Sequence, residues 1–264
     1  MRQICKLVVT VFASVAGIPF GLNTASAQEA LASGSDGYQF LVTPYLWLAS
    51  VHATTLTPLA GEPQVNSNVS TIDLLSHLDG APFMGSFEVR YGSLGFLADA
   101  IHLPVSTKIT THDIFYSGGN AGLEADTGTG IALYRFLEDP VQFADAGLGF
   151  RAWGFSSRVA LNPGLLPGVS VNPGGGWTDP LIGGRYHREL GNGWGLTGYG
   201  DVGGFGVGAH VDWQVLGTID YTLSPSWNLH LGYRSLNFNI TGSQGRFGFD
   251  VHMRGPIFAG TFRF

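Results

Sequence analysis

The chain has 264 residues and a formal net charge of −6, a length that fits one barrel or one to two soluble domains. Charged residues make up 12% of the chain, against about 25% in a typical soluble domain, and 40 glycines accompany 12% aromatic residues. The excess of acidic over basic residues argues against a nucleic-acid surface, which needs a basic stripe to neutralise phosphates.

The N-terminus has the three parts of a secretory signal. Arg2 and Lys6 precede an apolar run over residues 7–22, and small residues at 25–27 form a cleavage site that ends at Ala27. Residues 1–27 are therefore predicted to be a signal peptide. A buried N-terminal helix is the less favoured alternative, because proline and glycine interrupt the run just before the small residues.

Cleavage after Ala27 would leave a mature chain without cysteine, since Cys5 is the one cysteine of the sequence. Residues 28–37 are small and polar and are expected to form a short periplasmic tail. Residues 38–264 are expected to form a single domain. No stretch of about 20 uninterrupted apolar residues occurs, so any membrane crossing would use strands.

Apolar and polar residues alternate with a period of two through most of this domain, as in strands with one apolar face. The clearest run, 211–223, exceeds the roughly 9–11 residues that a tilted membrane strand requires, and Trp213 and Tyr221 lie near its two ends. After Tyr233 the apolar residues shift from odd to even positions, which indicates a bulge or an exit above the membrane near Ser235. The ten expected runs are 38–51, 83–91, 94–100, 132–136, 146–155, 178–190, 194–202, 211–223, 227–233 and 256–264.

The connections between these runs alternate in length. Short ones follow the even runs, at 92–93, 139–140, 191–193 and 224–226. Longer ones follow most odd runs, at 52–82, 106–126, 157–176 and 239–250. This arrangement is typical of outer-membrane barrels with short periplasmic turns and longer extracellular loops. We expect an all-β fold, a closed antiparallel transmembrane β-barrel of about ten strands, with eight strands or a soluble sandwich as alternatives.

The residues between the apolar positions would line the barrel interior. They carry both signs of charge in nearly equal number, and unpaired charges in a confined lumen would be costly, so a charge network that closes the interior is expected. Large aromatic side chains on the same face favour a plugged or narrow barrel, because wide channels need about 16–18 strands. The expected members of the network are Glu88, Arg90, Asp99, Arg135, Arg151, Asp179, Arg185, Glu189, Asp201, Asp212, Asp220, Arg234 and Arg263.

Asp250 and His252 resemble the Asp-x-His half of the omptin outer-membrane proteases, in which a carboxylate orients a histidine for water attack on a peptide. The other half of that motif, Asp-x-Asp, occurs nowhere in this sequence, so a solvated polar strand end and a non-enzymatic protein are expected. His210 and Asp212 supply too few ligands for a metal site. The glycine-rich stretch 195–208 lacks the strand-to-helix context of a phosphate loop, so no cofactor is expected.

The signal segment, the strand rhythm, the run 231–234 and the ending 262–264 together resemble the small outer-membrane β-barrel proteins of proteobacteria, in the broad sense of OmpA, OmpX and OmpW. The resemblance implies an outer-membrane location and contact with outer-membrane lipid. It also implies recognition by the barrel-assembly machinery, which reads the aromatic residues of the final strand. Here these residues are Phe258, Phe262 and Phe264.

Three functions follow from this sequence, in decreasing order of support. The first is a structural barrel whose long loops act as interaction or adhesion surfaces. The second is a narrow channel for small or hydrophobic solutes. The third is a surface hydrolase of the omptin kind.

Overall fold

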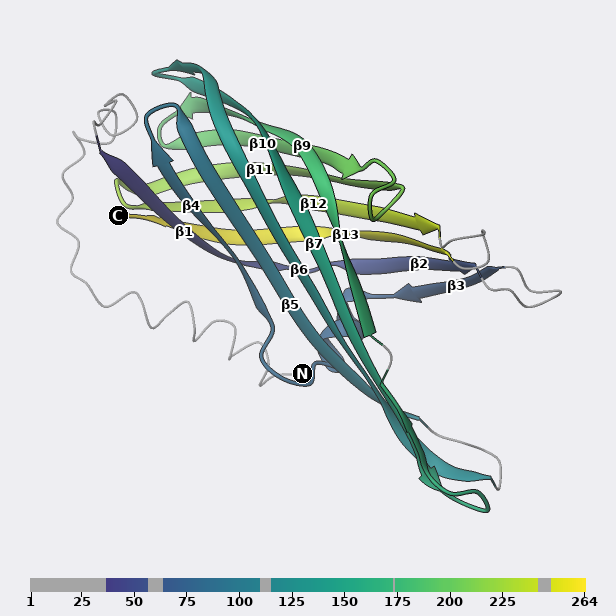
Figure 1. The fold of residues 1–264 in the computed structure, drawn as a ribbon. Coiled ribbons are helices and arrows are strands. Elements are labelled where there is room, and N and C mark those ends of the chain that lie inside the picture. The colour runs from purple at the N-terminus through teal and green to yellow at the C-terminus, as the bar shows by residue number, and fades with distance from the viewer. Residues whose placement is uncertain (1–36, 57–63, 110–114, 173, 242–247) are drawn as a thin grey trace.

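The computed structural model describes residues 37–56, 64–109, 115–172, 174–241 and 248–264, and shows an all-β protein built on a closed antiparallel barrel (Figure 1). The predicted signal peptide and nearly all of the predicted tail lie outside these residues. Ten strands form the barrel, which confirms the expected number; the eight-strand alternative and the soluble sandwich are wrong. In spatial order they are β1 (Tyr38–Trp47), β4 (Phe83–Tyr91), β5 (Leu94–Ile109), β6 (Tyr116–Asp139), β7 (Gln142–Pro163), β9 (Gly174–Gly191), β10 (Trp194–Gly204), β11 (Val211–Ser224), β12 (Trp227–Thr241) and β13 (Gly248–Arg263).

The last strand closes the barrel against the first. β13 pairs antiparallel with β1 from Leu41↔Arg263 to Trp47↔Ile257, and the Phe264 N–H donates to the Phe40 carbonyl at 3.0 Å. β1 also pairs with β4, so both of its edges are hydrogen-bonded. The expected pairing of the two terminal strands is confirmed.

Four short turns join strands at one end of the barrel, as the connection lengths predicted. They lie between β4 and β5, β6 and β7, β9 and β10, and β11 and β12. The β9–β10 turn shows why its sequence is Gly-Asn-Gly. Gly191, Asn192 and Gly193 all have positive φ, a region open to glycine and tolerated by asparagine.

Aromatic pairs mark the outer surface at this same end. Tyr38 lies 5.0 Å from Tyr91 between ring centroids, and Trp227 lies 4.9 Å from Phe262 on directly opposite positions of β12 and β13. Such cross-strand aromatic pairs stabilise a sheet by roughly 0.2–1 kcal/mol each. Between this end and the middle of the barrel, the outward residues are exposed and apolar. They include Phe40, Val42, Phe87, Phe96, Leu148, Phe150, Ile182, Leu196, Val215, Ile219, Leu229, Leu231 and Phe258, which we call the apolar belt.

At the opposite end the sheet continues past the barrel as two extensions (Figure 1). The β5–β8 extension consists of residues 103–109, 116–126 and 154–163 together with β8 (Val169–Val171), which pairs with β7. The β2–β3 extension consists of β2 (Ser50–Leu56), β3 (Gln64–Val69) and residues 235–241 and 248–255. Much of what the sequence predicted as loops is therefore strand, because each pair simply continues its ladder of hydrogen bonds.

β12 has no bulge near Ser235, contrary to one of the two explanations offered for its shift of pattern. Its pairing with β13 runs without interruption from Trp227↔Phe262 to Thr241↔Gly248. The other explanation, an exit above the membrane, stays a prediction. Above Tyr233 the outward positions become polar, while the inward Leu236 packs in the mouth of the barrel.

A short helix, α2 (Thr71–Ser76), follows β3. Ser70 caps it, because its hydroxyl accepts from the Asp73 N–H while the Asp73 carboxylate accepts from the Ser70 N–H and hydroxyl. The two hydrogen bonds that Ser70 donates to this carboxylate lower the pKa of Asp73 below its ordinary value. Across the described residues no α-helix has the length and hydropathy needed to span a membrane.

Candidate functional site

The interior of the barrel is the candidate site, because it gathers most of the buried polar side chains of the described residues. Side chains alternate across each strand, so every strand sends one row of residues inward. These rows come from strands far apart in sequence and meet around a common axis. The interior can be described in four layers, beginning at the end with the short turns.

The first layer centres on Asp145. Three guanidinium groups converge on this carboxylate: Arg90 at 2.9 Å, Arg135 at 2.9 Å and Arg185 at 2.7 Å. Glu88 adds a second carboxylate, which pairs with Arg185 at 2.7 Å and with Arg90 at 3.1 Å. Four strands, β4, β6, β7 and β9, are thereby linked through charged side chains that are mostly buried.

The second layer centres on Asp220. Its carboxylate accepts from the hydroxyls of Thr197 and Thr218 and contacts Nδ1 of His230 at 2.7 Å. His187 Nδ1 lies 3.4 Å from the same carboxylate. This group joins β9, β10, β11 and β12 through hydroxyl and imidazole contacts.

Arg234 forms the third layer in the middle of the barrel. It donates to Asp99 at 3.0 Å, to the Tyr45 hydroxyl at 2.9 Å and to the Gln214 amide oxygen at 2.6 Å. Its guanidinium carbon also lies 4.9 Å from the centroid of the Trp47 ring. One arginine therefore ties β12 to β1, β5 and β11 across the lumen.

The fourth layer is a fully buried ion triad. Arg151 pairs with Asp201 at 2.7 Å and with Asp212 at 2.5 Å, and all three side chains have no exposed surface. Arg151 Nε also donates to the Thr129 hydroxyl, and Trp153 Nε1 donates to Asp212 at 3.0 Å. Removing Arg151 would leave two carboxylates buried without their cation, which costs several kcal/mol.

Directly above the triad, apolar side chains fill the mouth of the barrel. Trp47, Trp153, Leu236 and Ile257 are buried against one another, and Trp153 lies 4.5 Å from Phe238 between ring centroids. We call these five residues the mouth cluster. Side chains of four strands, β1, β7, β12 and β13, meet there, so they occupy the interior at this level.

An interior cavity of about 270 Å³ remains on the side of the short turns. Its lining includes Thr222, Pro225 and Asn228 beside the β11–β12 turn, and it reaches inward to Tyr199 and Ile257. Ile257 belongs to the mouth cluster. The cavity therefore extends from the turn end and stops at the filled mouth.

The structure brings together nine of the charged residues that the sequence assigned to the interior. They are Glu88, Arg90, Asp99, Arg135, Arg151, Arg185, Asp201, Asp212 and Arg234, all of which form Arg–carboxylate ion pairs. Asp220 and Glu189 instead contact histidines. Asp179 accepts from Trp177 Nε1 and the Ala209 N–H, and Arg263 lines the cavity.

The sequence interpretation missed Asp145, the centre of the first layer. It began the fifth strand at Ala146, whereas β7 begins four residues earlier, at Gln142. The alternation of side chains along the strand could have identified it, because Asp145, Arg151 and Trp153 are all at odd positions and so lie on the same face. Extending the inward row of Arg151 by three steps toward the turn would have included Asp145.

The aromatic residues of the final strand lie on its outer side. Phe258 is 43% and Phe264 70% exposed, and Phe262 packs edge-on against Phe264 at 4.6 Å between centroids. Trp227 covers the other side of Phe262. The chain thus ends in an exposed aromatic cluster beside the short turns.

Asp250 and His252 lie on the outer face of the β2–β3 extension and are half exposed. His252 Nε2 is 3.3 Å from Asp250, and the Asn237 amide contacts both side chains. In the next strand His52 is directly opposite His252. Within the described ranges, no group of three or more His, Cys, Asp or Glu side chains is placed to hold a metal ion.

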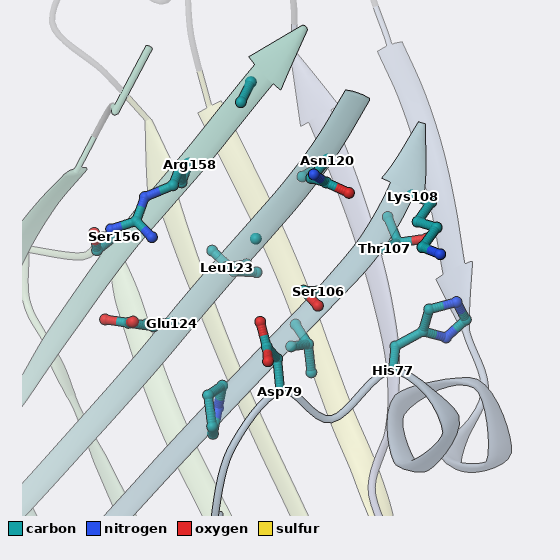
Figure 2. A pocket seen from close by; sticks show the side chains of 15 residues that line it. His77, Asp79, Ser106, Thr107, Lys108, Asn120, Leu123, Glu124, Ser156 and Arg158 are labelled. Carbon is teal, nitrogen blue, oxygen red and sulfur yellow. The ribbon is translucent and has the colours of Figure 1, made fainter. Parts of the chain in front are cut away.

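A hollow of about 740 Å³ lies on the outer face of the β5–β8 extension (Figure 2). Lys108, Glu124 and Arg158 project from three neighbouring strands, and His77 and Asp79 approach from the segment after α2 (Figure 2). The hollow mixes both signs of charge. The hollow is open, and no residue of the mouth cluster lines it.

No protein-family model matches the sequence, and no curated protein matches it. Among solved structures, the chain is similar to the outer membrane protease OmpT from Escherichia coli, with a TM-score of 0.54 and 11% identity over 87% of this chain and 98% of that one. The translocator domain of the autotransporter NalP from Neisseria meningitidis gives a TM-score of 0.38 at 13% identity, covering 90% of this chain and 92% of that one. The likeness to OmpT shows a shared barrel fold.

Proposed function

We propose that this chain is an integral outer-membrane β-barrel with a closed interior and a structural or surface-interaction role. The observation that carries the proposal is the filling of one end of the lumen by the Arg151 triad and the mouth cluster together. Both lie within the cross-section of the barrel. A solute path would have to separate ion pairs and apolar contacts at the same level.

The membrane location is supported by the apolar belt and by the aromatic pairs at its edge. Large apolar side chains facing water in such number would be costly for a soluble protein, whereas lipid matches them. Barrel closure supplies partners for the strand edges, which lipid demands. The exposed aromatic cluster at Phe264 fits the assembly signal, and the predicted signal peptide fits export.

Planar-bilayer recording tests the closed interior. The refolded protein should give no reproducible unitary openings, because the buried triad and the mouth cluster leave no continuous water path. Far-UV circular dichroism of the same refolded protein would show that β-structure is present. Regular unitary currents from folded protein would contradict the closed barrel and favour the narrow channel, for which the cavity beside the β11–β12 turn would form one entrance.

The non-enzymatic part of the proposal is supported by the sequence, which lacks Asp-x-Asp, and by the position of Asp250 and His252 on an outer, half-exposed face. A peptide-cleavage assay on folded protein should detect no turnover. Cleavage that disappears in both Asp250→Asn and His252→Ala would overturn this part and restore the hydrolase hypothesis. Cleavage that survives both variants would point to a contaminating protease.

A further inference from the structure

The helix α2 is fixed at the level where the outer surface of the barrel changes character. The Thr71 hydroxyl donates to the Leu48 carbonyl at 3.0 Å, and the Leu48 N–H donates to the Pro256 carbonyl at 2.9 Å. On β13, Phe258 lies outward on the barrel side of Pro256, and the polar Arg254 lies outward on the other. α2 is therefore attached at the row that separates the apolar belt from the polar extension.

The chain after α2 is tied to the opposite side of the gap between the two extensions. The Ser106 N–H donates to the His77 carbonyl at 2.7 Å, and the Asp79 N–H donates to the Pro104 carbonyl at 3.1 Å. The segment then enters β4 at Phe83, an outward residue that is 58% exposed. Hydrogen bonds on both sides thus hold α2 beside the outer surface, and the chain reaches β4 after residues 77–82.

α2 is amphipathic despite its length. Ile72 and Leu75, three residues apart and so on one face, are 77% and 48% exposed. Asp73, Ser76 and His77 form hydrogen bonds on the polar side, where Ser76 and His77 both contact the Asp73 carbonyl. Ile72 is the most exposed large apolar side chain of the described residues. Ile72 and Leu75 thus form an exposed apolar face on this helix.

We propose that α2 lies in the interface of the outer leaflet, with Ile72 and Leu75 among the lipid acyl chains. The occupant is lipid, because the helix is held at the upper edge of the belt by the Thr71–Leu48 hydrogen bond and its exposed apolar face adds to the apolar surface there. Its polar side would face headgroups and water, as in other interfacial helices. The inference rests on the proposed membrane location and adds an anchor outside the strands.

Lipid-quenching fluorescence tests the anchor. In a Cys5→Ser background the chain has no other cysteine, so single positions can be labelled with an environment-sensitive fluorophore. The test position is Ile72→Cys, the matched control on the polar side of the same helix is Ser76→Cys, and the belt reference is Leu231→Cys. Each labelled protein is folded into phosphatidylcholine vesicles with and without lipids brominated along the acyl chain.

At Ile72→Cys the label should show blue-shifted emission and quenching by brominated lipid close to that at Leu231→Cys, whereas the label at Ser76→Cys should remain polar and weakly quenched. Equal, weak quenching at Ile72→Cys and Ser76→Cys, with strong quenching at Leu231→Cys, would overturn the anchor and leave the membrane barrel intact. Absence of quenching at Leu231→Cys would overturn the membrane location itself, and the anchor with it.

Discussion

The barrel and its two extensions use the same strands with opposite polarity. In the barrel the outward row is apolar, as at Leu231 and Phe258, and the inward row carries charges such as Arg234. In the extensions the outward row carries His52 and Asp250, and the inward row is rich in apolar residues, among which Phe238 and Met253 pack at the mouth. The alternation continues without a slip in register along β12 and β13.

This reversal shows that the surroundings of each face, and no change in strand geometry, decide the sequence pattern. Side chains keep alternating because the pleat fixes their direction. What changes is the medium outside, which in the proposed orientation is lipid around the barrel and water around the extensions. The boundary falls between Tyr233 and Ser235 on β12 and between Pro256 and Arg254 on β13.

Deletion of Phe264 should have the largest effect on this arrangement. Its N–H bonds to Phe40 and its ring covers Phe262, so the deletion weakens the seam that closes the barrel at the belt. We expect loss of most assembled barrel, measured as heat-modifiable mobility in membrane fractions. Deletion of 165–166, exposed residues after β7, should leave assembly nearly normal. Normal assembly without Phe264 would contradict its role as closing residue and assembly signal.

Substitution of a buried arginine in the barrel interior should lower the free energy of unfolding far more than substitution of an arginine on the extension surface. Arg151→Met leaves Asp201 and Asp212 buried without their cation, and we expect a loss of about 3–5 kcal/mol in the free energy of unfolding. The matched Arg158→Met, on the exposed outer face of the β5–β8 extension, should change it by no more than about 0.5 kcal/mol. Denaturant titration in vesicles measures both, and equal costs would argue against a sealed interior.

Arginine placed on the outer surface should locate the boundary. Leu231→Arg puts a charge in the belt and should cost about 2–4 kcal/mol, the range for a charge near the bilayer midplane. Thr54→Arg, on the outer face of β2 opposite Asp250, should cost about 0.5 kcal/mol or less. Both are measured by unfolding in vesicles. A tolerated arginine at Leu231 would show that this row does not face lipid.

The smallest effect should come from the cap of α2. Ser70→Ala removes the hydroxyl of the capping box and should destabilise the helix by about 1 kcal/mol, seen as faster amide hydrogen exchange over α2 after correction for intrinsic rates. The pKa of Asp73 is lower in the folded helix than in the unfolded chain. Asp73 therefore stabilises the helix at pH values above its ordinary pKa, and this stabilisation is lost as the pH falls through the lowered folded pKa. In Ser70→Ala this acid dependence should weaken, whereas Asp139→Asn at the β6–β7 turn should leave it unchanged.

The sequence located nine interior ion-pairing residues by parity alone, yet it did not reveal their partners. The convergence of Arg90, Arg135 and Arg185 on Asp145 depends on how four strands are staggered around the barrel. A bulge in β6 near Phe136, where the register shifts between Arg135 and Leu137, also moves the row that faces Asp145. Neither the stagger nor this bulge can be predicted from the alternation of apolar and polar residues.

By itself the sequence determined the strands, their two faces, the four short turns and the closing of β13 on β1. Each follows from local alternation, turn chemistry and the need to pair every edge. Only the tertiary structure decided that the expected loops would extend the sheet, that Leu236 would plug the mouth and that α2 would lie at the rim. Those outcomes depend on which residues of distant strands reach the same height, and that is set by the stagger of the closed barrel.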